Sequence, residues 1–301
     1  MPSISHHADN LALTKQTLEK CFDGLQIKDI QVIGKGHDSI AYVVNKEYVF
    51  KTKFSIDKKQ YQKEKEISDF LNKNLKTHIK IPQIEYSYIS DELAVLGYKK
   101  ILGTFLTPQN YALMSSNAQN TLKKDIADFL RKMHDLDDTP LMKYRVDDRK
   151  GMLDGCAFLQ KTFLGKMTDI EKKYLDDFIK TLQLTTVFEG RKCLCHSDFG
   201  CSHLLLNEAN KLAGIIDFGD SKITDEYCDF MYLLEESSEE IGPAFGEDIL
   251  KLYGQIDIEK AKEYQTLNEQ YYPLECILYG LKNNDQSQID IGRAEIRSRL
   301  K

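Results

Sequence analysis

The hydrophobic pattern of the chain changes about a third of the way along, and this change constrains the fold more than any other feature. The first part contains runs rich in Val, Ile, Tyr and Phe, which are typical of strands: residues 27–33, 39–44, 48–53, 83–88 and 93–101. Between them, residues 57–76 have helical spacing. Further along, helical spacing dominates, over residues 122–133, 170–182 and 225–234. We therefore expect an α+β protein with a small antiparallel sheet and one helix, followed by a larger, mainly helical part.

A segment of weak periodicity separates these two parts. Residues 103–116 contain turn residues and no clear apolar stripe. We therefore expect a connection there, which would divide the chain into an N-terminal lobe, 1–102, and a C-terminal lobe, 103–301.

The charge balance excludes some classes of protein. The chain has 41 Lys and Arg against 47 Asp and Glu, a formal charge of −6, which disfavours a nucleic-acid binder with a basic surface. No run approaches the roughly 18 apolar residues of a membrane-spanning helix. Residues 1–21 also lack the apolar core of a signal peptide. We expect a cytoplasmic monomer that binds neither membranes nor nucleic acids.

Seven cysteines, an odd number spread over a long chain, indicate reduced thiols rather than a disulfide framework. One local cluster could hold zinc; it comprises Cys193, Cys195, His196, Cys201 and His203. The paired spacing is Cys-x-Cys, however, and no second pair follows at the distance found in zinc fingers. Buried, inert thiols are therefore the favoured interpretation.

Phosphoryl transfer from a nucleotide requires a cover over the phosphates, a cation, metal-binding carboxylates and a base. The Gly34-Lys35-Gly36 turn lies between two predicted strands, where glycine allows close approach of the backbone to a ligand. Ser39 could add a hydroxyl group. The same glycines are also common in simple hairpin turns, so this signal alone is weak.

A lysine and a glutamate form the second candidate pair. Lys51 lies two residues beyond Val49, on the same face of its predicted strand. Glu64 lies on the apolar stripe of the predicted helix, where a carboxylate is costly unless a cation meets it. Glu66 is the rival partner, but its helical neighbours are mostly polar. We therefore predict a Lys51–Glu64 ion pair.

Two aspartates flank a predicted hairpin. Residues 203–206 and 212–217 are short apolar runs within the segment 196–219, and four turn-forming residues separate them. Asp198 and Asp217 stand at its two ends, so folding of the hairpin would bring both carboxylates together. One could accept a proton from a hydroxyl group while the other holds a metal ion. Taken singly, each aspartate could also be an ordinary turn residue.

These segments resemble the protein-kinase-like fold of the aminoglycoside phosphotransferases, and in particular the 2″-phosphotransferases. The resemblance covers roughly residues 27–296. Its motifs are Gly34-x-Gly36-x-Asp38-Ser39, Lys51, Glu64, Cys195-His196-Ser197-Asp198-Phe199 and Gly214-Ile215-Ile216-Asp217-Phe218-Gly219-Asp220, followed by Asp225 and Asp229. A bilobal fold and nucleotide-dependent phosphorylation are what this resemblance implies.

The resemblance also implies roles for individual residues. Asp198 would be the base, and Mg²⁺ would be held by Asp217 and by His203, which stands where kinases usually have asparagine. A histidine that only bonds within the loop remains the alternative. The nucleotide would contact the hinge residues Tyr98, Lys99 and Ile101. A bulky Tyr98 resembles the enzymes that prefer GTP, so we expect GTP, with ATP as the alternative donor.

The acceptor is expected to be a polycation, because acidic residues gather beside the predicted phosphoryl-transfer site. They are Asp198, Asp220, Glu235, Glu236, Glu239 and Glu240, and the family match adds Tyr272 and Glu275. The implied activity is antibiotic resistance, by phosphorylation of an aminoglycoside hydroxyl group, the 2″-OH. Two alternatives stay open: another small-molecule kinase, acting on choline, homoserine or methylthioribose, or a non-catalytic nucleotide-binding module.

Overall fold

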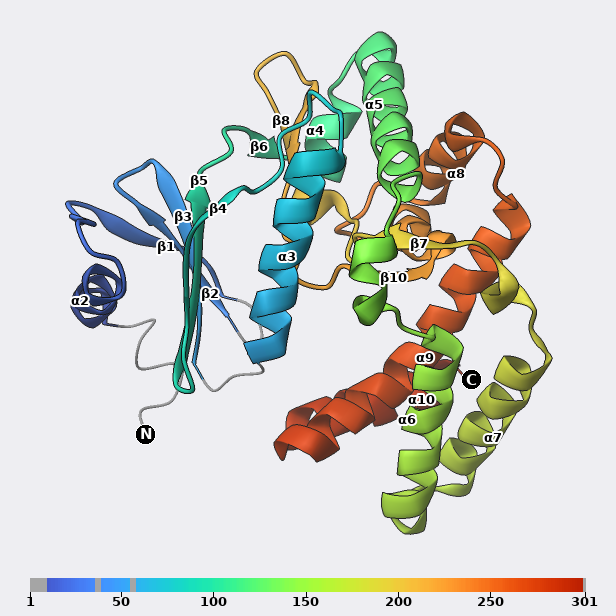
Figure 1. Ribbon diagram of the computed structural model, residues 1–301. Coiled ribbons are helices and arrows are strands. Elements are labelled where there is room, and N and C mark those ends of the chain that lie inside the picture. Colours follow the sequence, from blue (N-terminus) through green and yellow to red (C-terminus); the bar gives the residue numbers. More distant parts are fainter. Residues whose placement is uncertain (1–9, 36–38, 55–57, 300–301) are drawn as a thin grey trace. The chain divides into compact units, whose positions relative to one another are not determined.

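The computed structural model describes residues 10–35, 39–54 and 58–299, and the chain separates into two compact units. The first unit consists of Met1–Leu136 and Gly200–Ser221, and the second of Asp137–Phe199 and Lys222–Lys301. This division by packing differs from the expected lobes, 1–102 and 103–301, which remain a prediction. Figure 1 shows the elements of each unit.

A five-stranded antiparallel sheet forms the centre of the first unit (Figure 1). Its strands are β1 (Ile30–Lys35), β2 (Ile40–Val44), β3 (Tyr48–Phe54), β4 (Ile84–Ile89) and β5 (Leu93–Lys99), in the order β1-β2-β3-β5-β4. All five strands lie within three residues of their predicted positions. The antiparallel sheet and the α+β class are therefore confirmed.

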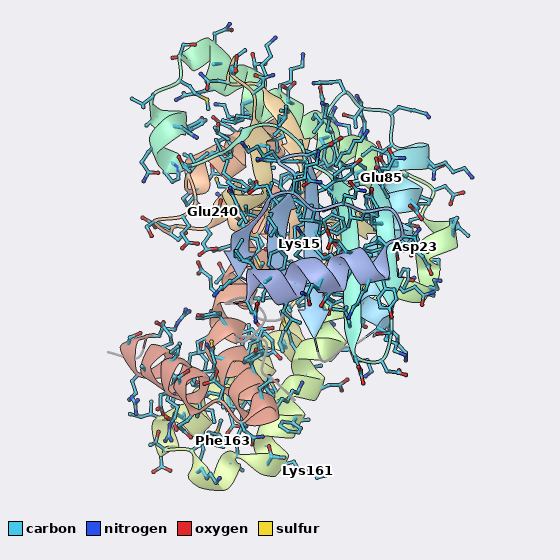
Figure 2. All side chains as sticks on the ribbon, turned by 90° about the vertical axis from the view of Figure 1, so that its left-hand side faces the viewer. Lys15, Asp23, Glu85, Lys161, Phe163 and Glu240 are labelled. Atoms are coloured by element: carbon cyan, nitrogen blue, oxygen red, sulfur yellow. The ribbon has the colours of Figure 1, made fainter. Side chains whose placement is uncertain are left out.

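Alternation along the strands gives the sheet two apolar faces. Tyr42 and Phe50 pack with Leu18 of α2 (Leu11–Cys21), whereas Val43 and Val49 pack with Tyr61 of α3 (Lys58–Asn74). Figure 2 shows α2, which carries Lys15, running across its face of the sheet. We expected only the helix α3; α2 is an additional helix, capped by the side chain of Asn10.

The predicted hairpin is present in the first unit. Its strands are β8 (Leu204–Leu206) and β9 (Leu212–Ile215), preceded by the 3₁₀ turn η4 (Cys201–His203). They pair with β6 (Thr104–Phe105) in the order β6-β8-β9. The helices α4 (Pro108–Ala112) and α5 (Ser116–His134) complete this unit, and α5 confirms the helix expected over residues 122–133.

The second unit is mainly helical. Its α-helices are α6 (Asp148–Thr162), α7 (Asp169–Leu184), α8 (Pro243–Tyr253), α9 (Ile258–Asn283) and α10 (Gln286–Arg299). A two-stranded antiparallel sheet joins β7 (Lys192–Cys195) to β10 (Lys222–Asp225). Short 3₁₀ helices are η1 (Thr139–Tyr144), η2 (Leu164–Lys166), η3 (Val187–Glu189), η5 (Glu226–Phe230) and η6 (Tyr232–Leu234).

The prediction of an α-helix over residues 225–234 was wrong. The structure has β10 end at Asp225 and then two 3₁₀ turns, η5 and η6. All five residues of η5 are buried, so no polar face is left to make an amphipathic α-helix. Among the described residues, no helix is both long enough and apolar enough to cross a bilayer.

Candidate functional site

A buried ion cluster lies between the sheet and α3 of the first unit. Lys51 Nζ donates to Glu64 Oε1 at 3.1 Å and to Asp217 Oδ1 at 2.7 Å. The Lys51 side chain is 12% exposed and that of Glu64 8%. The predicted Lys51–Glu64 pair is therefore present, and Asp217 joins it.

Local structure explains why these three groups meet. Lys51 follows Val49 on the face of β3 that packs against α3, and Glu64 points from the buried stripe of that helix. Asp217 follows β9 in a left-handed backbone conformation with φ 65°. A Cβ atom at Gly219 would lie 3.3 Å from Glu64 Oε2 and 3.2 Å from Asp217 Oδ1, so glycine allows this turn to approach the cluster.

The neighbouring carboxylates keep Lys51, at the centre of the cluster, protonated. Burial alone would lower the pKa of the Lys51 ammonium group, but Glu64 and Asp217 more than offset it and raise the pKa well above the ordinary value. Burial raises the pKa of Glu64, and Lys51 counteracts it only in part. Burial also raises the pKa of Tyr98. The charge of Lys51 acts to lower this pKa, and the charge of Asp217 acts to raise it. A phenol, an ammonium group and two carboxylates thus share one site.

The hairpin brings His203 beside Asp217. Ile216 N donates to His203 O at 3.0 Å, directly beyond the β8–β9 pairing. As a result, His203 Nε2 lies 4.0 Å from Asp217 Oδ2. One cation bonded at about 2.1 Å to each atom could span this separation, so the two donors fit a shared Mg²⁺.

The glycine turn is described only in part. Gly34 lies in β1, at an irregularity of the β1–β2 pairing between Val32 and Gly34. Gly36 and Asp38 fall outside the described residues. Ser39 is half-buried and directly precedes β2. The predicted cover over the phosphates therefore remains a prediction.

The expected hinge residues follow one another at the end of β5. Tyr98 is buried on the face that carries Lys51, and the side chain of Lys99 is exposed. Ile101 is buried against β9, where a Cβ atom at Gly214 would lie 2.5 Å from Ile101 Cγ2. Gly214 thus permits the close packing that fixes the chain just after Lys99.

Asp198 belongs to the second unit, so its predicted meeting with Asp217 stays a prediction. Its loop is held by Asp229, a fully buried residue of η5. Asp229 accepts from His196 N at 2.9 Å and from Ser197 N at 2.7 Å. Ser197 has φ 69°, and Asp198 N lies 3.3 Å from His196 Nδ1. Asp229 belongs to the family motif, but its role in holding the loop could not be predicted from the sequence, because the contact joins residues 32 and 33 positions apart.

The acidic residues of the expected acceptor region differ in environment. Glu236 and Glu239 are exposed, whereas Glu240, labelled in Figure 2, is buried. Glu235 is half-buried, and burial together with Glu269 raises its pKa. The sequence patterns did not identify Glu269, because it lies on α9, far along the chain from the other acidic residues. Asp220 is exposed in the first unit and contributes to the raised pKa of Glu64.

A cavity of about 370 Å³ lies beside the loop that carries Asp198, entirely within the second unit. Its wall includes Ser197, Tyr232, Tyr271 and Glu275. Burial raises the pKa of Tyr232, and the charges of Asp198, Glu235 and Glu275 raise it further. Tyr271, rather than the predicted Tyr272, lines this cavity; Tyr272 is 48% exposed.

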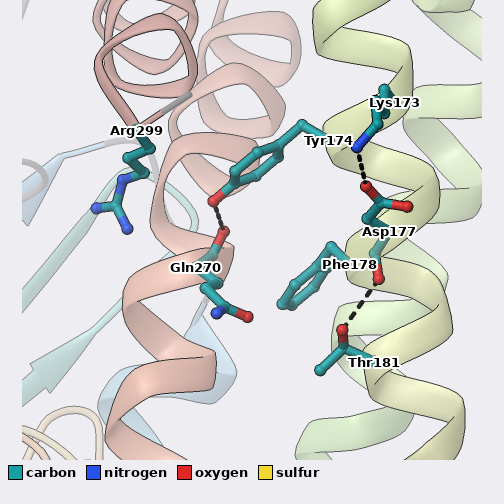
Figure 3. Close-up of a pocket in the computed structure, with 7 residues that line it drawn as sticks. All are labelled: Lys173, Tyr174, Asp177, Phe178, Thr181, Gln270 and Arg299. Atoms are coloured by element: carbon teal, nitrogen blue, oxygen red, sulfur yellow. Dashed lines mark hydrogen bonds and ion pairs between the residues drawn. The ribbon is translucent and has the colours of Figure 1, made fainter. Parts of the chain in front are cut away.

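A second cavity of the same unit, about 340 Å³, lies between α7, α9 and the end of α10 (Figure 3). Tyr174 Oη donates to Gln270 O at 2.7 Å, and Lys173 pairs with Asp177 at 2.8 Å. Of the site residues predicted above and described by the structure, none lines it. This cavity therefore gives no support to the predicted chemistry.

The cysteine cluster shows buried thiols. All seven cysteines are free, and Cys193 Sγ lies 3.8 Å from Cys195 Sγ within β7. Burial and the neighbouring Cys193 thiol raise the pKa of Cys195 well above the ordinary value. A thiol with a raised pKa is a poor nucleophile, which fits the inert interpretation.

Comparison with known proteins identifies the family. The family model described as "Phosphotransferase enzyme family" matches residues 29–264. Among solved structures, APH(2″)-IIa in complex with gentamicin is 27% identical, covers 95% of each chain and superposes with a TM-score of 0.82. The ADP-bound aminoglycoside phosphotransferase APH(2″)-Ib is 26% identical, with coverage of 95% and 96% and a TM-score of 0.80.

A more distant structure agrees in fold alone. The GDP complex of aminoglycoside 2′-phosphotransferase-IIIa is 22% identical, with coverage of 96% and 98% and a TM-score of 0.78. The family match spans well over half of the chain, and the five-stranded sheet and the helical second unit agree with the kinase-like architecture of these structures. The chain therefore belongs to the phosphotransferase enzyme family and has the kinase-like fold of the aminoglycoside phosphotransferases.

Proposed function

We propose that the protein is a cytoplasmic, monomeric antibiotic-resistance kinase that transfers the γ-phosphate of GTP or ATP to the 2″-hydroxyl group of an aminoglycoside. The observation that carries this proposal is the largely buried Lys51–Glu64 pair, which the partly exposed Asp217 joins. A buried ammonium group held by one carboxylate and shared with a second is suited to binding phosphate oxygens.

The first unit would bind the nucleotide. Gly34, Gly36 and Ser39 would cover its phosphates, and backbone groups of Lys99 and Ile101 would meet the base. Lys51 would bind phosphate oxygens while Glu64 keeps its ammonium group in place. Tyr98 would narrow the pocket that adenine would use, which supports GTP as the preferred donor. The ADP bound to APH(2″)-Ib supports a nucleotide donor and keeps ATP as the alternative.

Asp217 and His203 would hold Mg²⁺, because their donor atoms lie 4.0 Å apart. When bound, Mg²⁺ neutralises negative charge on the phosphates. Asp217 would serve as a ligand of the metal ion, and Lys51, held in place by Glu64, would donate to phosphate oxygens.

Asp198 would be the general base. Its carboxylate would accept the proton of the acceptor hydroxyl as that oxygen bonds to the γ-phosphorus and the bond to the bridging oxygen breaks. The nucleoside diphosphate leaves, and no covalent phosphoenzyme forms. Asp229 would hold the loop of Asp198 through the two backbone bonds described above.

The acceptor would lie against the acidic residues of the second unit. Glu235, Glu236, Glu239 and Glu275 would offer carboxylates to its ammonium groups. Tyr272 would pack against a sugar ring, and Asp220 would add a charge. Each exposed ion pair contributes only about 0–1 kcal/mol, so several must act together. The gentamicin bound to APH(2″)-IIa supports a polycationic acceptor.

Acceptor screening tests the proposal. The protein is incubated with Mg²⁺, GTP or ATP, and gentamicin, kanamycin, choline, homoserine or methylthioribose. We expect nucleotide consumption with the aminoglycosides, and a product whose phosphorylated hydroxyl is assigned by mass spectrometry and NMR. Consumption only with choline, homoserine or methylthioribose would assign the protein to another kinase class. Nucleotide binding without any phosphorylated product would indicate a binding module.

Asp198→Asn provides the matched catalytic control. It should reduce kcat by about 10²- to 10⁴-fold while nucleotide affinity stays nearly unchanged. Full turnover in this variant would show that another group is the base.

A further inference from the structure

The cavity beside the Asp198 loop contains a positive charge that a pocket for a polycation does not need. Lys222, at the start of β10, lines this cavity and its side chain is 26% exposed. Lys222 Nζ pairs with Asp148 Oδ1 at 2.8 Å. Glu275, one of the residues proposed to meet the acceptor, lines the same cavity, so an acceptor ring seated there would also face the Lys222 ammonium group.

Both carboxylate oxygens of Asp148 accept hydrogen bonds. Its Oδ1 accepts from Lys222, and its Oδ2 accepts from Thr224 at 2.6 Å and from Tyr264 at 2.7 Å. The carboxylate is 9% exposed. Burial acts to raise the pKa of Asp148, but Lys222 and the hydrogen bonds outweigh it and lower the pKa. Asp148 therefore stays ionised, but it is buried and both of its oxygens already accept from groups of this chain.

Lys222, by contrast, keeps donors available. An ammonium group has three N–H donors, and Asp148 takes one of them. Among the described residues, Asp148 is its sole hydrogen-bond partner. Burial would lower the pKa of Lys222, but Cys228 and Asp148 offset it and leave the pKa above the ordinary value. This wall of the cavity therefore donates hydrogen bonds and repels cations.

Glu275, which lines the same cavity, is an acidic group. Burial raises the pKa of Glu275, and the charges of Lys222 and Lys282 lower it in part. Glu275 can accept from one ammonium group. Tyr264 and Tyr271 also line this cavity, and their aromatic rings suit the apolar face of a sugar ring.

We propose that Lys222, held by Asp148, is a specificity-determining residue: it limits this cavity to a ring that places hydroxyl or ether oxygens against it and excludes a ring with an ammonium group there. This inference rests on the proposed function. It narrows the acceptor class to aminoglycosides whose seated ring has hydroxyl groups on one side and at most one ammonium group, near Glu275.

The test compares two acceptors that differ by one amino group in place of a hydroxyl group, such as kanamycin B and kanamycin A. The double variant Asp148→Asn/Lys222→Met removes both charges together, so that no buried carboxylate is left unpaired. We expect the wild-type protein to favour the hydroxyl form, and the ratio of KM values to shift by about tenfold toward the amino form in the double variant.

Two controls separate specificity from folding. Lys222→Arg keeps the charge and should keep the wild-type ratio. Asp177→Asn/Lys173→Met removes an ion pair of the same length, 2.8 Å, on α7 and should leave the ratio unchanged. A merely structural role would lower thermal stability or change kcat equally for both acceptors, and would leave the KM ratio unchanged.

The outcomes are distinct. An unchanged KM ratio in a folded, active double variant overturns the inference and leaves the proposed function standing. Failure of the wild-type protein to phosphorylate either acceptor, while it consumes nucleotide with a different small molecule, overturns the proposed function and this inference with it.

Discussion

Lys51 and Asp217 are 166 positions apart in the sequence, and their charged groups meet at 2.7 Å. The contact joins a strand of the central sheet to the turn that follows the hairpin. Because Glu64 also accepts from Lys51, two carboxylates share one ammonium group in this structure.

Replacement of Lys51 by methionine should leave Glu64 and Asp217 without their cation. We expect a loss of about 3 kcal/mol in the free energy of unfolding, measured by urea denaturation, and a loss of nucleotide affinity, measured by calorimetry. Lys53→Met, two residues further along β3 on the same face, is the matched control and should retain nucleotide binding. Wild-type nucleotide affinity in Lys51→Met would contradict the role of Lys51.

His203 should contribute to metal affinity. We expect His203→Ala to raise the Mg²⁺ concentration for half-maximal activity by about 10- to 100-fold, and chelation by EDTA to abolish turnover. His203→Asn, which restores an oxygen donor, should recover much of the loss. His78→Asn, an exposed histidine of the same unit, is the control. An unchanged Mg²⁺ requirement in His203→Ala would leave His203 as a loop residue only.

Asp229 should act as a positioning residue. Replacement by alanine removes the acceptor of two buried backbone N–H groups, which costs about 2–4 kcal/mol in stability. Asp229→Asn keeps one acceptor oxygen and should fold better. We expect kcat to fall in both variants while nucleotide affinity stays the same. A fall in nucleotide affinity with unchanged kcat would argue against this role.

Tyr98 should influence the choice of donor. Tyr98→Leu opens space at a position that is 5% exposed, so we expect the kcat/KM for ATP relative to GTP to rise by about tenfold. Tyr86→Leu, on the opposite face of the sheet, controls for the loss of an aromatic ring. A ratio that does not change would mean that Tyr98 only packs within the core.

Acceptor affinity should depend on pH through Glu275. Burial raises the pKa of this carboxyl group above its ordinary 4.5, so it takes up a proton at a higher pH than a free glutamate does. Its attraction for an ammonium group is present above that raised pKa and is lost as the pH falls through it. We expect KM to rise between pH 7.5 and about 5 in the wild-type protein, and Glu275→Gln to show a flatter profile with a higher KM at neutral pH.

Local patterns in the sequence predicted much of the fold. The alternating runs placed all five strands, and the apolar stripe of α3 identified Glu64 as a buried carboxylate in need of a cation. Those predictions depend on residues that are close in sequence. The short α2 helix was not anticipated, because its apolar residues are few and Leu11 and Leu13 are exposed.

Long-range pairings could not be predicted in the same way. Asp148 and Lys222 are 74 positions apart, and neither neighbourhood indicates that they meet. The residues of η5 have helical spacing, but burial on every side and the tight path after β10 give 3₁₀ turns instead. Tertiary packing determines these features, whereas the hydrophobic periodicity of a sequence indicates only which face of a single element is apolar.

The first unit is assembled from two stretches of chain, Met1–Leu136 and Gly200–Ser221. During synthesis on the ribosome, its sheet can form early, but Asp217 and the hairpin are still untranslated. Until residue 221 has emerged, Glu64 is therefore the only one of the two carboxylates that can pair with the Lys51 ammonium group. A nascent chain arrested before that point would contain every strand of the five-stranded sheet but an incomplete cluster of Lys51, Glu64 and Asp217.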